Sequence, residues 1–509
     1  MNTETSQKIW RWSRRLLVAL AVLVTLAAGL IVEENGRSKH AWETYRQSAE
    51  ARGERFDWSL FGTNALTAEQ NFFKAPIFAP LFMAEWDDQK LEWKPLPTNT
   101  VDRLKMSVYR SDGSSPKGPG GAWDRARLTQ LASWQEYYRN SATNHRNEFP
   151  VSAQTNSPAS DVLLALSKYD SAIEELRAAG ERPTSRIGDY SGGNAQKIGL
   201  LLRYLSAIKG CAQVLQLRAI AELADQKSTA ALADVQLLLR LDAALRQEPL
   251  LIAHLVSLAV TSITLQPIYE GLAQHRWTEV QLAQLQIALA ERDYLADFQR
   301  TMTGERAFTF ETLENQRLTR EYKSIQTVGQ QSKVVTTSLR LMPSAFFYQN
   351  ELTLARLNDQ FARTLVDVTN HLVSPTRVHQ TDQEINTELH SYNPYKVMAA
   401  QVCPAFSKGI LKFALLQAWL DLAQTGCALE RFRLAQGHYP VTLSELSPRF
   451  LTGIPHDLIN GLPLHYQRTV EGKFILYSVG WDETDDGGQI RETKSGGFDR
   501  EHGDWVWKY

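Results

Sequence analysis

The sequence predicts a mainly α-helical protein with a single N-terminal transmembrane helix, an irregular helical bundle as its body and a small α+β module at the C-terminus. Three observations predict this fold class. An uncharged apolar run lies near the N-terminus, apolar residues recur at intervals of three and four from about 161 to 434, and two short strand patterns follow near the C-terminus. With 509 residues, the chain is long enough for two or three folded units behind an anchor.

The composition argues against several classes of protein. Hydrophobic residues make up 43% and charged residues 22%, which is usual for a globular protein and not for a disordered chain or a polytopic membrane protein. Lys plus Arg number 55 against 56 for Asp plus Glu, so no nucleic-acid partner is expected. Cys211, Cys403 and Cys427 form no CxxC motif and are expected to be buried free thiols. A Cys403–Cys427 pair in an oxidising compartment is the alternative.

Residues 16–32 are predicted to anchor the chain in a membrane. These seventeen residues carry no charge, and as a helix they span about 25 Å against a hydrocarbon core of roughly 30 Å. Four basic residues lie in the preceding tail, 1–15, and Glu33 and Glu34 follow the run. The positive-inside rule then leaves the N-terminus in the cytoplasm and the body on the other side of the membrane. A cleaved signal peptide is the alternative, because small residues lie near the end of the run.

The two segments after the anchor differ in character. Residues 33–54 are polar with apolar positions at helical spacing and predict a juxtamembrane helix. Residues 55–160 form a mixed segment rich in tryptophan and proline, which favours short strands and irregular loops. Its tryptophans have no repeating spacing, so we expect them to fill a core, and glycan binding by ring stacking is the alternative.

Residues 161–412 are predicted to form the helical body. Proline and glycine mark helix boundaries at Gly180 and Pro249, and Thr278 with Gln281 forms a capping box that opens a helix. Short connections predict antiparallel neighbours, and no repeat of solenoid length is sustained.

The motifs of the common catalytic machineries, HExxH, GxSxG, Walker A and the Rossmann fingerprint, do not occur in this sequence. This weighs against an enzyme without excluding one. His254 lies in an apolar run and is expected to be a hydrogen-bonded core residue. The carboxylate pairs Glu174–Glu175 and Glu305 with Glu311 are expected to be solvated. An exported hydrolase or glycan-binding protein, with a site between the Trp-rich segment and the helical body, is the alternative function.

The segment 413–509 begins with a long helical pattern that ends at Gly437. Two strands are predicted at 462–469 and 473–480, joined at 470–472 as a hairpin. We therefore expect a helix packed on a small antiparallel sheet.

The order of residues in this segment resembles the soluble domain of the type II secretion major pseudopilin family. The matching residues are Ala428, Leu429, Glu430, Gly437, Tyr439, Pro440, Pro455, Asp457, Gly461, Pro463, Tyr466, Tyr477, Ser478, Gly480 and Asp482. That family joins this helix directly to its membrane segment, whereas residues 33–412 intervene here. The resemblance therefore favours a borrowed or related module over a pilus subunit. Over its whole length the chain also resembles membrane-anchored bacterial proteins without a known activity.

The resemblance implies a calcium site, because the acidic loop of those pseudopilins binds calcium. Residues 480–509 contain eight carboxylates and several glycines, and calcium takes six to eight oxygen ligands. The candidate ligands are Leu476, Ser478, Asp482, Asp485, Asp486 and Asp504. A flexible solvated loop is the alternative. The first functional hypothesis is a non-enzymatic structural or interaction protein that contacts envelope or secretion-related proteins.

Overall fold

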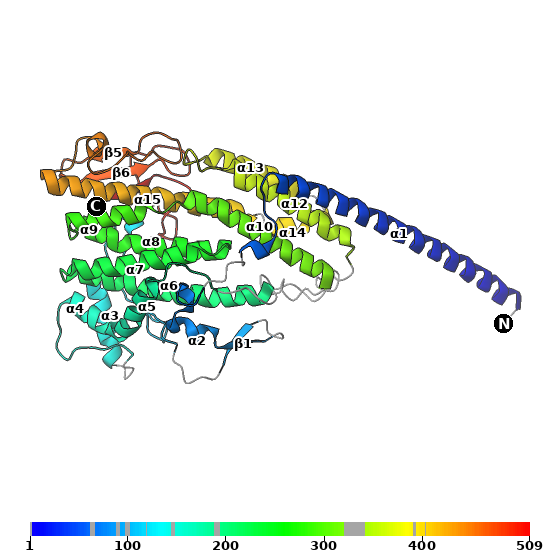
Figure 1. The fold of residues 1–509 in the computed structure, drawn as a ribbon, viewed down its shortest axis with the longest axis horizontal. Coiled ribbons are helices and arrows are strands. Elements are labelled where there is room, and N and C mark those ends of the chain that lie inside the picture. The colour runs from blue at the N-terminus through cyan, green and yellow to red at the C-terminus, as the bar shows by residue number, and fades with distance from the viewer. Residues whose placement is uncertain are drawn as a thin grey trace. The chain divides into compact units, whose positions relative to one another are not determined.

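The computed structural model describes residues 3–61, 67–87, 92–96, 102–118, 120–143, 148–187, 194–319, 342–389, 393–402 and 404–509. It is mainly helical, with 63% of residues in helices and 7% in strands, which confirms the predicted fold class at this level. The helices are α1 (Thr3–Ala51), α2 (Ala79–Phe82), α3 (Leu131–Thr143), α4 (Pro158–Leu166), α5 (Asp170–Gly180), α6 (Asn194–Ala224), α7 (Ser228–Arg246), α8 (Leu251–Ala273), α9 (Glu279–Ala290), α10 (Tyr294–Thr319), α12 (Ser344–Thr364), α13 (Pro375–Leu389), α14 (Val397–Val402) and α15 (Pro404–Gln436) (Figure 1).

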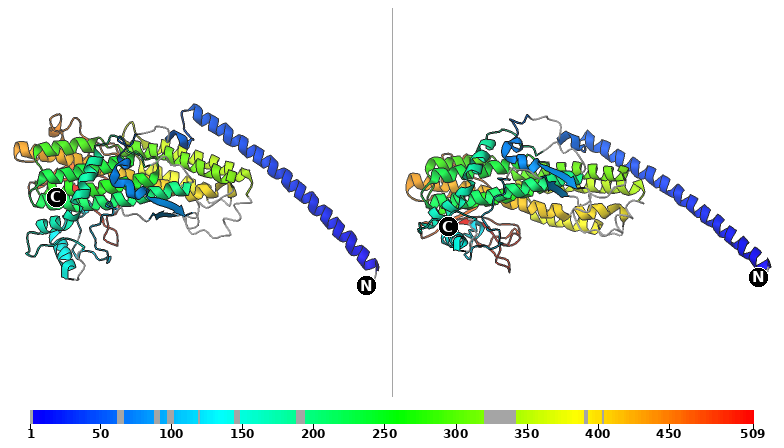
Figure 2. Two further views of the ribbon diagram at one scale, coloured as in Figure 1. Left: turned by 60° about the horizontal axis from the view of Figure 1, so that its bottom comes forward. Right: turned by 90° about the horizontal axis from the view of Figure 1, so that it is seen from below.

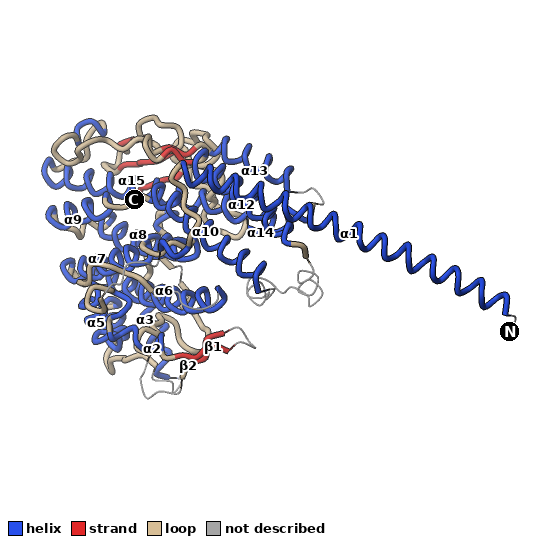
Figure 3. The backbone as a smooth tube through the Cα atoms, turned by 45° about the vertical axis from the view of Figure 1, so that its right-hand side comes forward, coloured by secondary structure: helices blue, strands red, loops and turns tan. Residues whose placement is uncertain are grey.

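The strands of the described residues form three small antiparallel sheets, which are red in Figure 3. The first two are hairpins and the third has three strands. Their members are β1 (Ala84–Asp87) with β2 (Glu92–Pro95), β3 (Val366–Asp367) with β4 (Leu372–Val373), and β5 (His465–Arg468), β6 (Phe474–Ser478) and β7 (Trp505–Lys508) in that order.

The chain divides into two compact units. Unit 1 consists of residues 1–58, 306–359 and 383–404, and unit 2 consists of residues 59–305, 360–382 and 405–509. Figure 2 shows the elements of both units from two further directions.

Unit 1 is built around the second half of α1. The ring of Trp42 packs edge-on against Phe56 and Phe310, with centroids 5.7 and 5.1 Å away. Arg306 donates to the carboxylate of Glu54, and both side chains are almost completely buried. Each member of a buried ion pair requires the other, because removing one leaves an uncompensated charge. The aromatic and ionic contacts therefore join α1 firmly to α10.

The helices of unit 1 alternate in direction. Arg306, early in the unit 1 part of α10, contacts the end of α1, whereas Arg317 lies over the ring of Tyr348 at the start of α12. The start of α12 contacts α1 near residue 35, through a hydrogen bond from Ala345. Hence α10 returns toward the apolar run and α12 leads away from it again, so the two helices are antiparallel neighbours.

The core of unit 2 is formed by α6, α7 and α8, which pack against one another in all three pairings and lie side by side in Figure 1. α8 is apolar on nearly every face, and a helix of this kind belongs in an interior. Its residue His254 is fully buried, and its Nε2 lies 2.8 Å from the carbonyl oxygen of Glu248. The prediction of a core histidine is therefore confirmed, and burial lowers its pKa to about 3.

Three helices in the described part of the chain are long and apolar enough to cross a membrane: the segment Trp10–Ala51 of α1, Gln196–Ala224 of α6 and Leu251–Ala273 of α8. They differ in what surrounds their apolar side chains. The apolar window of α1 is not buried at all, whereas 44% of that of α6 and 67% of that of α8 are buried. Burial inside the bundle explains the hydrophobicity of α6 and α8, and only α1 leaves its apolar run uncovered.

Several local predictions can be compared with the structure. The polar segment after residue 32 continues the same helix as the apolar run, up to Ala51. The capping box of Thr278 and Gln281 is present at the start of α9. Cys211 and Cys427 are buried free thiols as predicted, and Cys403 lies outside the described residues. In the mixed segment, the helix α3 was not predicted.

We expect Gly304→Ala to destabilise the protein by about 2 kcal/mol, because a Cβ at this position in α10 would lie 2.0 Å from the carbonyl oxygen of Pro249. Backbone atoms cannot rotate away, so the helix itself must shift. Gly409→Ala in α15 is the matched control, since its Cβ would only meet Leu251 at 3.9 Å. A helical Gly→Ala change without a clash should stabilise by about 0.5–1 kcal/mol. Thermal unfolding followed by circular dichroism compares the two variants, and equal melting temperatures would contradict the prediction.

Candidate functional site

The C-terminal sheet is organised by the buried carboxylate of Asp457. Its Oδ1 accepts hydrogen bonds from the hydroxyl of Ser478 and the backbone N–H of Ile459, both at 2.9 Å. Its Oδ2 accepts from the backbone N–H of Val479 at 2.9 Å. Asp457 is fully buried, so these three donors replace the water that an exposed carboxylate would bind. The carboxylate therefore holds the turn at 457–462 against the end of β6.

Two of the predicted calcium ligands lie in the central strand β6. Leu476 pairs with Tyr466 of β5 on one side and with Trp507 of β7 on the other. Its carbonyl therefore points toward a neighbouring strand and not into the acidic loop. The hydroxyl of Ser478 donates to Asp457, as described above. β7 was not predicted from the sequence. It is only four residues long, and no turn signal joins it to the strand β6 with which it pairs.

The carboxylates of Asp482 and Asp485 are bound by groups of the same module. Asp482 accepts a hydrogen bond from the backbone N–H of Gly503 at 2.9 Å. Asp485 accepts from the hydroxyl of Tyr477 at 3.0 Å and from the N–H of Gly487 at 2.9 Å. The Gly487 N–H holds the pKa of Asp485 below its ordinary value. Both carboxylates thus accept hydrogen bonds that brace the loop.

Asp486 and Asp504 complete the predicted ligand set. Asp486 forms an ion pair with Arg491, with two nitrogen–oxygen distances of 3.2 Å. Asp504 is fully buried and accepts from three backbone N–H groups, the shortest being that of Gly488 at 2.7 Å. Burial raises the pKa of Asp504, although the three N–H groups favour its carboxylate.

The six predicted ligands are therefore brought into one module but not around one point. Within the ranges that the structure describes, no group of three or more His, Cys, Asp or Glu side chains is arranged to hold a metal ion. Calcium binding by this loop stays a prediction. The ion pair between Arg491 and Asp486 was not predicted from the sequence. The signal for it was a basic residue five positions after an aspartate in a glycine-rich loop.

A second set of polar groups is buried between α7, α8 and α10. The carboxylate of Asp242 accepts hydrogen bonds from Ser257, from the hydroxyl of Tyr294 at 2.9 Å and from Arg292 Nε at 2.9 Å. Burial and the nearby Asp242 raise the pKa of Tyr294 well above its ordinary value. Asp242 itself is fully buried, and its donors satisfy both oxygens. The arrangement cross-links three helices, and the sequence signal was an aspartate on the apolar face of a helix.

Glu305 corrects one prediction. It was expected to be solvated, but its Oε1 accepts a hydrogen bond of 2.6 Å from the N–H of Leu251, at the start of α8. Burial raises the pKa of Glu305 to about 7. A carboxylate beside a helix N-terminus is stabilised by the free N–H groups there. Glu174 and Glu175 remain on the surface, where they pair with Arg177 and Arg103.

One acid and base pair consists of Asp421 of α15 and His371 of the β3–β4 turn. The distance from His371 Nε2 to Asp421 Oδ2 is 3.9 Å, which is too long for a direct hydrogen bond. Burial raises the pKa of Asp421 to about 7 and lowers the pKa of His371. This geometry defines no substrate and no reaction.

Three tryptophans of the mixed segment, Trp86, Trp93 and Trp123, pack against other parts of unit 2. The ring of Trp123 lies 4.2 Å from that of Trp419 in α15 and 5.7 Å from that of Trp507 in β7, between ring centroids. Its indole N–H donates to the carbonyl of Ser262 in α8 at 2.9 Å. Trp86 and Trp93 pack on α6, where a Cβ at Gly199 would approach both rings within about 3.1 Å. These three rings thus pack against the protein itself, as the core interpretation predicted.

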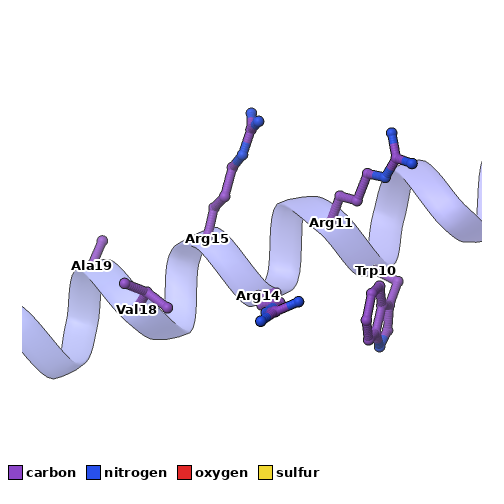
Figure 4. Close-up of a pocket in the computed structure, with 6 residues that line it drawn as sticks. All are labelled: Trp10, Arg11, Arg14, Arg15, Val18 and Ala19. Atoms are coloured by element: carbon purple, nitrogen blue, oxygen red, sulfur yellow. The ribbon is translucent and has the colours of Figure 1, made fainter.

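Basic and aromatic side chains cluster at the N-terminal end of α1. Figure 4 shows the side chains that line a hollow on the helix surface: Trp10, Arg11, Arg14, Arg15, Val18 and Ala19. The guanidinium of Arg14 lies 5.9 Å from the ring centroid of Trp10. Trp10 and Trp12 are 64% and 69% exposed, and so are most large apolar side chains of the following run. Cationic and indole groups beside an uncovered apolar helix are typical of a membrane interface.

Comparison of the chain with protein-family profiles found no matching family. Comparison with curated proteins and with solved structures also found no match. The function proposed below therefore depends on the sequence and structure of this chain alone.

We expect Asp457→Ala to destabilise the C-terminal sheet by about 3 kcal/mol, because it leaves two backbone N–H groups and one hydroxyl without their acceptor. Glu471→Ala is the matched control, since Glu471 is exposed in the β5–β6 turn. Hydrogen exchange at Val479 measures the effect. Protection that is equal in both variants would contradict the part assigned to Asp457.

Calcium binding can be tested on the full chain by calorimetric titration. As arranged, Asp486 must leave Arg491 before it can bind an ion, so we expect weak binding, and Arg491→Ala should tighten it by several-fold. Asp482→Ala combined with Asp486→Ala should abolish the heat of binding. An affinity unaffected by either change would place any bound calcium elsewhere in the protein.

Proposed function

We propose that the chain is a single-pass protein of a bacterial inner membrane whose folded body is extracytoplasmic and serves a structural or interaction role. The observation that carries this proposal is the exposed apolar run at 16–32 of α1. Apolar side chains in this number are not left in water by a folded protein. A helix also satisfies its own backbone hydrogen bonds, as hydrocarbon requires.

The orientation follows from the charges at the two ends of this run. Lys8, Arg11, Arg14 and Arg15 precede it, and Glu33 and Glu34 follow it. Basic residues are retained on the cytoplasmic side, so the N-terminus is cytoplasmic and the chain after the apolar run lies outside. Trp10 and Trp12 then lie at the cytoplasmic interface, where the indole ring has one polar and one apolar edge.

The structural or interaction role is supported by how the body uses its polar groups. Asp242 and Asp457, both fully buried, are saturated by donors from the fold. A glycan-binding site would need exposed rings, but Trp86 and Trp93 pack against α6, and Trp123 packs against α8 and α15. These groups stabilise the body. A protein whose buried polar groups bind one another is suited to presenting a rigid surface to envelope or secretion-related partners.

We further propose that residues 413–509 form a module related to the soluble domain of major pseudopilins. What supports this is the order of its elements, in which the long helix α15 is followed by the antiparallel strands β5 and β6 and by a loop rich in aspartate and glycine. Asp457 and Ser478 are both among the residues that carry the resemblance, and they are joined by a hydrogen bond.

We expect the protein to stay in the membrane fraction after an alkaline carbonate wash, and Leu20→Arg with Leu23→Arg to release it. An arginine at the centre of a membrane helix costs about 2.5–3.5 kcal/mol in insertion, so two such changes remove most of the driving force of a seventeen-residue span. Gln47→Arg is the matched control, since it adds a charge on the exposed side of α1 beyond the run.

The mass of the purified chain separates the anchor from the cleaved signal peptide. An intact N-terminus in the membrane fraction supports the anchor. A mature chain that begins after residue 29, recovered in the soluble fraction, would refute it.

A further inference from the structure

One end of unit 1 lies beside the outer end of the apolar run. The side-chain oxygen Oδ1 of Asn35 accepts a hydrogen bond of 2.7 Å from the backbone N–H of Ala345, in the first turn of α12. One turn further along α1, the hydroxyl of Ser38 accepts a hydrogen bond of 3.0 Å from the amide of Gln349. These bonds place the start of α12 against residues 35–38 of α1.

The start of α14 lies at the same end of unit 1, beside α12 (Figure 3). Tyr395, just before α14, forms a side-chain hydrogen bond with Glu34 of α1. The backbone N–H of Met398 donates to Asn350 of α12 at 3.0 Å. The start of α12 and the residue before α14 therefore both meet the first two turns of α1 that follow the apolar run.

The helix geometry sets how far these contacts lie from the membrane. A helix rises 1.5 Å per residue, so Asn35 lies about 4.5 Å beyond Val32 and Ser38 about 9 Å beyond it. The polar headgroup region on each side of a bilayer is roughly 5–7 Å thick. In addition, the apolar run is about 5 Å shorter than an average hydrocarbon core, which brings the bilayer surface closer to residue 35. This end of unit 1 thus lies within the headgroup layer.

Two large apolar side chains are exposed at this end. Leu318, in the last turn of α10, is 63% exposed, and its neighbour Arg317 lies 5.0 Å from the ring centroid of Tyr348. Val397, the first residue of α14, is 46% exposed. Behind them lies an apolar cluster of Phe346 and Phe347 with Met342, Tyr395 and Met398 packed against it.

The charged residues near these side chains are paired within unit 1. Arg37, 72% exposed on α1, forms an ion pair with Glu34, and Lys396, which directly precedes Val397, forms one with Glu388. These pairs leave no single-sign charge beside the two apolar side chains. An exposed apolar pair at the depth calculated above matches the boundary between headgroups and acyl chains.

We propose that this end of unit 1, formed by Leu318, Met342, Tyr395, Val397 and Met398, docks on the same phospholipid bilayer that α1 crosses. The proposal rests on the proposed function, because it requires α1 to span the membrane. The lipid surface covers Leu318 and Val397, and the body is held to the membrane by two contacts instead of one. The second contact restricts tilting of unit 1 relative to the membrane plane.

The test measures the depth of single spin labels in the full-length protein, reconstituted in vesicles of phosphatidylethanolamine and phosphatidylglycerol. The labels are attached at Leu318→Cys and Val397→Cys in a parent whose three native cysteines are replaced by alanine. Power saturation compares collision with oxygen, which concentrates in lipid, against collision with a water-soluble nickel chelate. We expect both labels to favour oxygen over the nickel chelate by several-fold relative to an aqueous position.

Two further labels distinguish the failure of this inference from the failure of the proposed function. Ala51→Cys is the aqueous reference, because it is exposed and lies about 24 Å beyond Asn35 along α1. Leu23→Cys is the lipid reference at the centre of the run. If the labels at 318 and 397 behave like that at 51 while that at 23 is in lipid, the docking is refuted and the anchor stands. An aqueous label at 23 would overturn both proposals.

Discussion

The continuity of α1 is the constraint on which the rest of unit 1 depends. A chain in hydrocarbon must satisfy each backbone N–H and C=O internally, and a helix does this over any length. Here the helix does not end with its apolar run but continues to Ala51, so its polar half becomes part of the folded body. Trp42 in that half packs against Phe310 of α10, and Glu54, three residues beyond the helix, forms an ion pair with Arg306 of α10. The membrane segment and the first folded unit share one rigid element instead of a linker.

Buried carboxylates have a comparable part within unit 2. Asp242 joins α7 to α8 and α10, and Asp457 joins a turn to the central strand of the C-terminal sheet. Each has its oxygens occupied by donors from different parts of the chain. Since a buried charge without such donors would cost several kcal/mol, these residues specify one arrangement of the surrounding elements. These two carboxylates therefore hold together elements that are distant in the chain.

The C-terminal sheet is not independent of the helical body. Trp507 of β7 meets Trp123 from the mixed segment, and Tyr269 of α8 donates its hydroxyl to the carbonyl of Lys508 at 3.1 Å. Arg127 reaches across to Glu492 in the acidic loop. A fragment that begins at the long helix α15 would lose all of these contacts, so binding to the acidic loop is a property to measure in the intact chain.

Periodicity and composition alone were enough to identify the helical class, the apolar run of α1, the capping box at Thr278 and the core position of His254, because these depend on residues close in sequence. Sequence could also nominate Asp482 and its neighbours as oxygen ligands, since aspartates among glycines are visible in one loop. Only the tertiary structure decided where those oxygens point, that Arg491 neutralises Asp486 and that β7 completes the sheet. The same holds for Leu318 and Val397, which are far apart in the chain and unremarkable in their own segments. Contacts between distant residues depend on how helices pack, and packing is set by the summed shapes and charges of many side chains that no local pattern encodes.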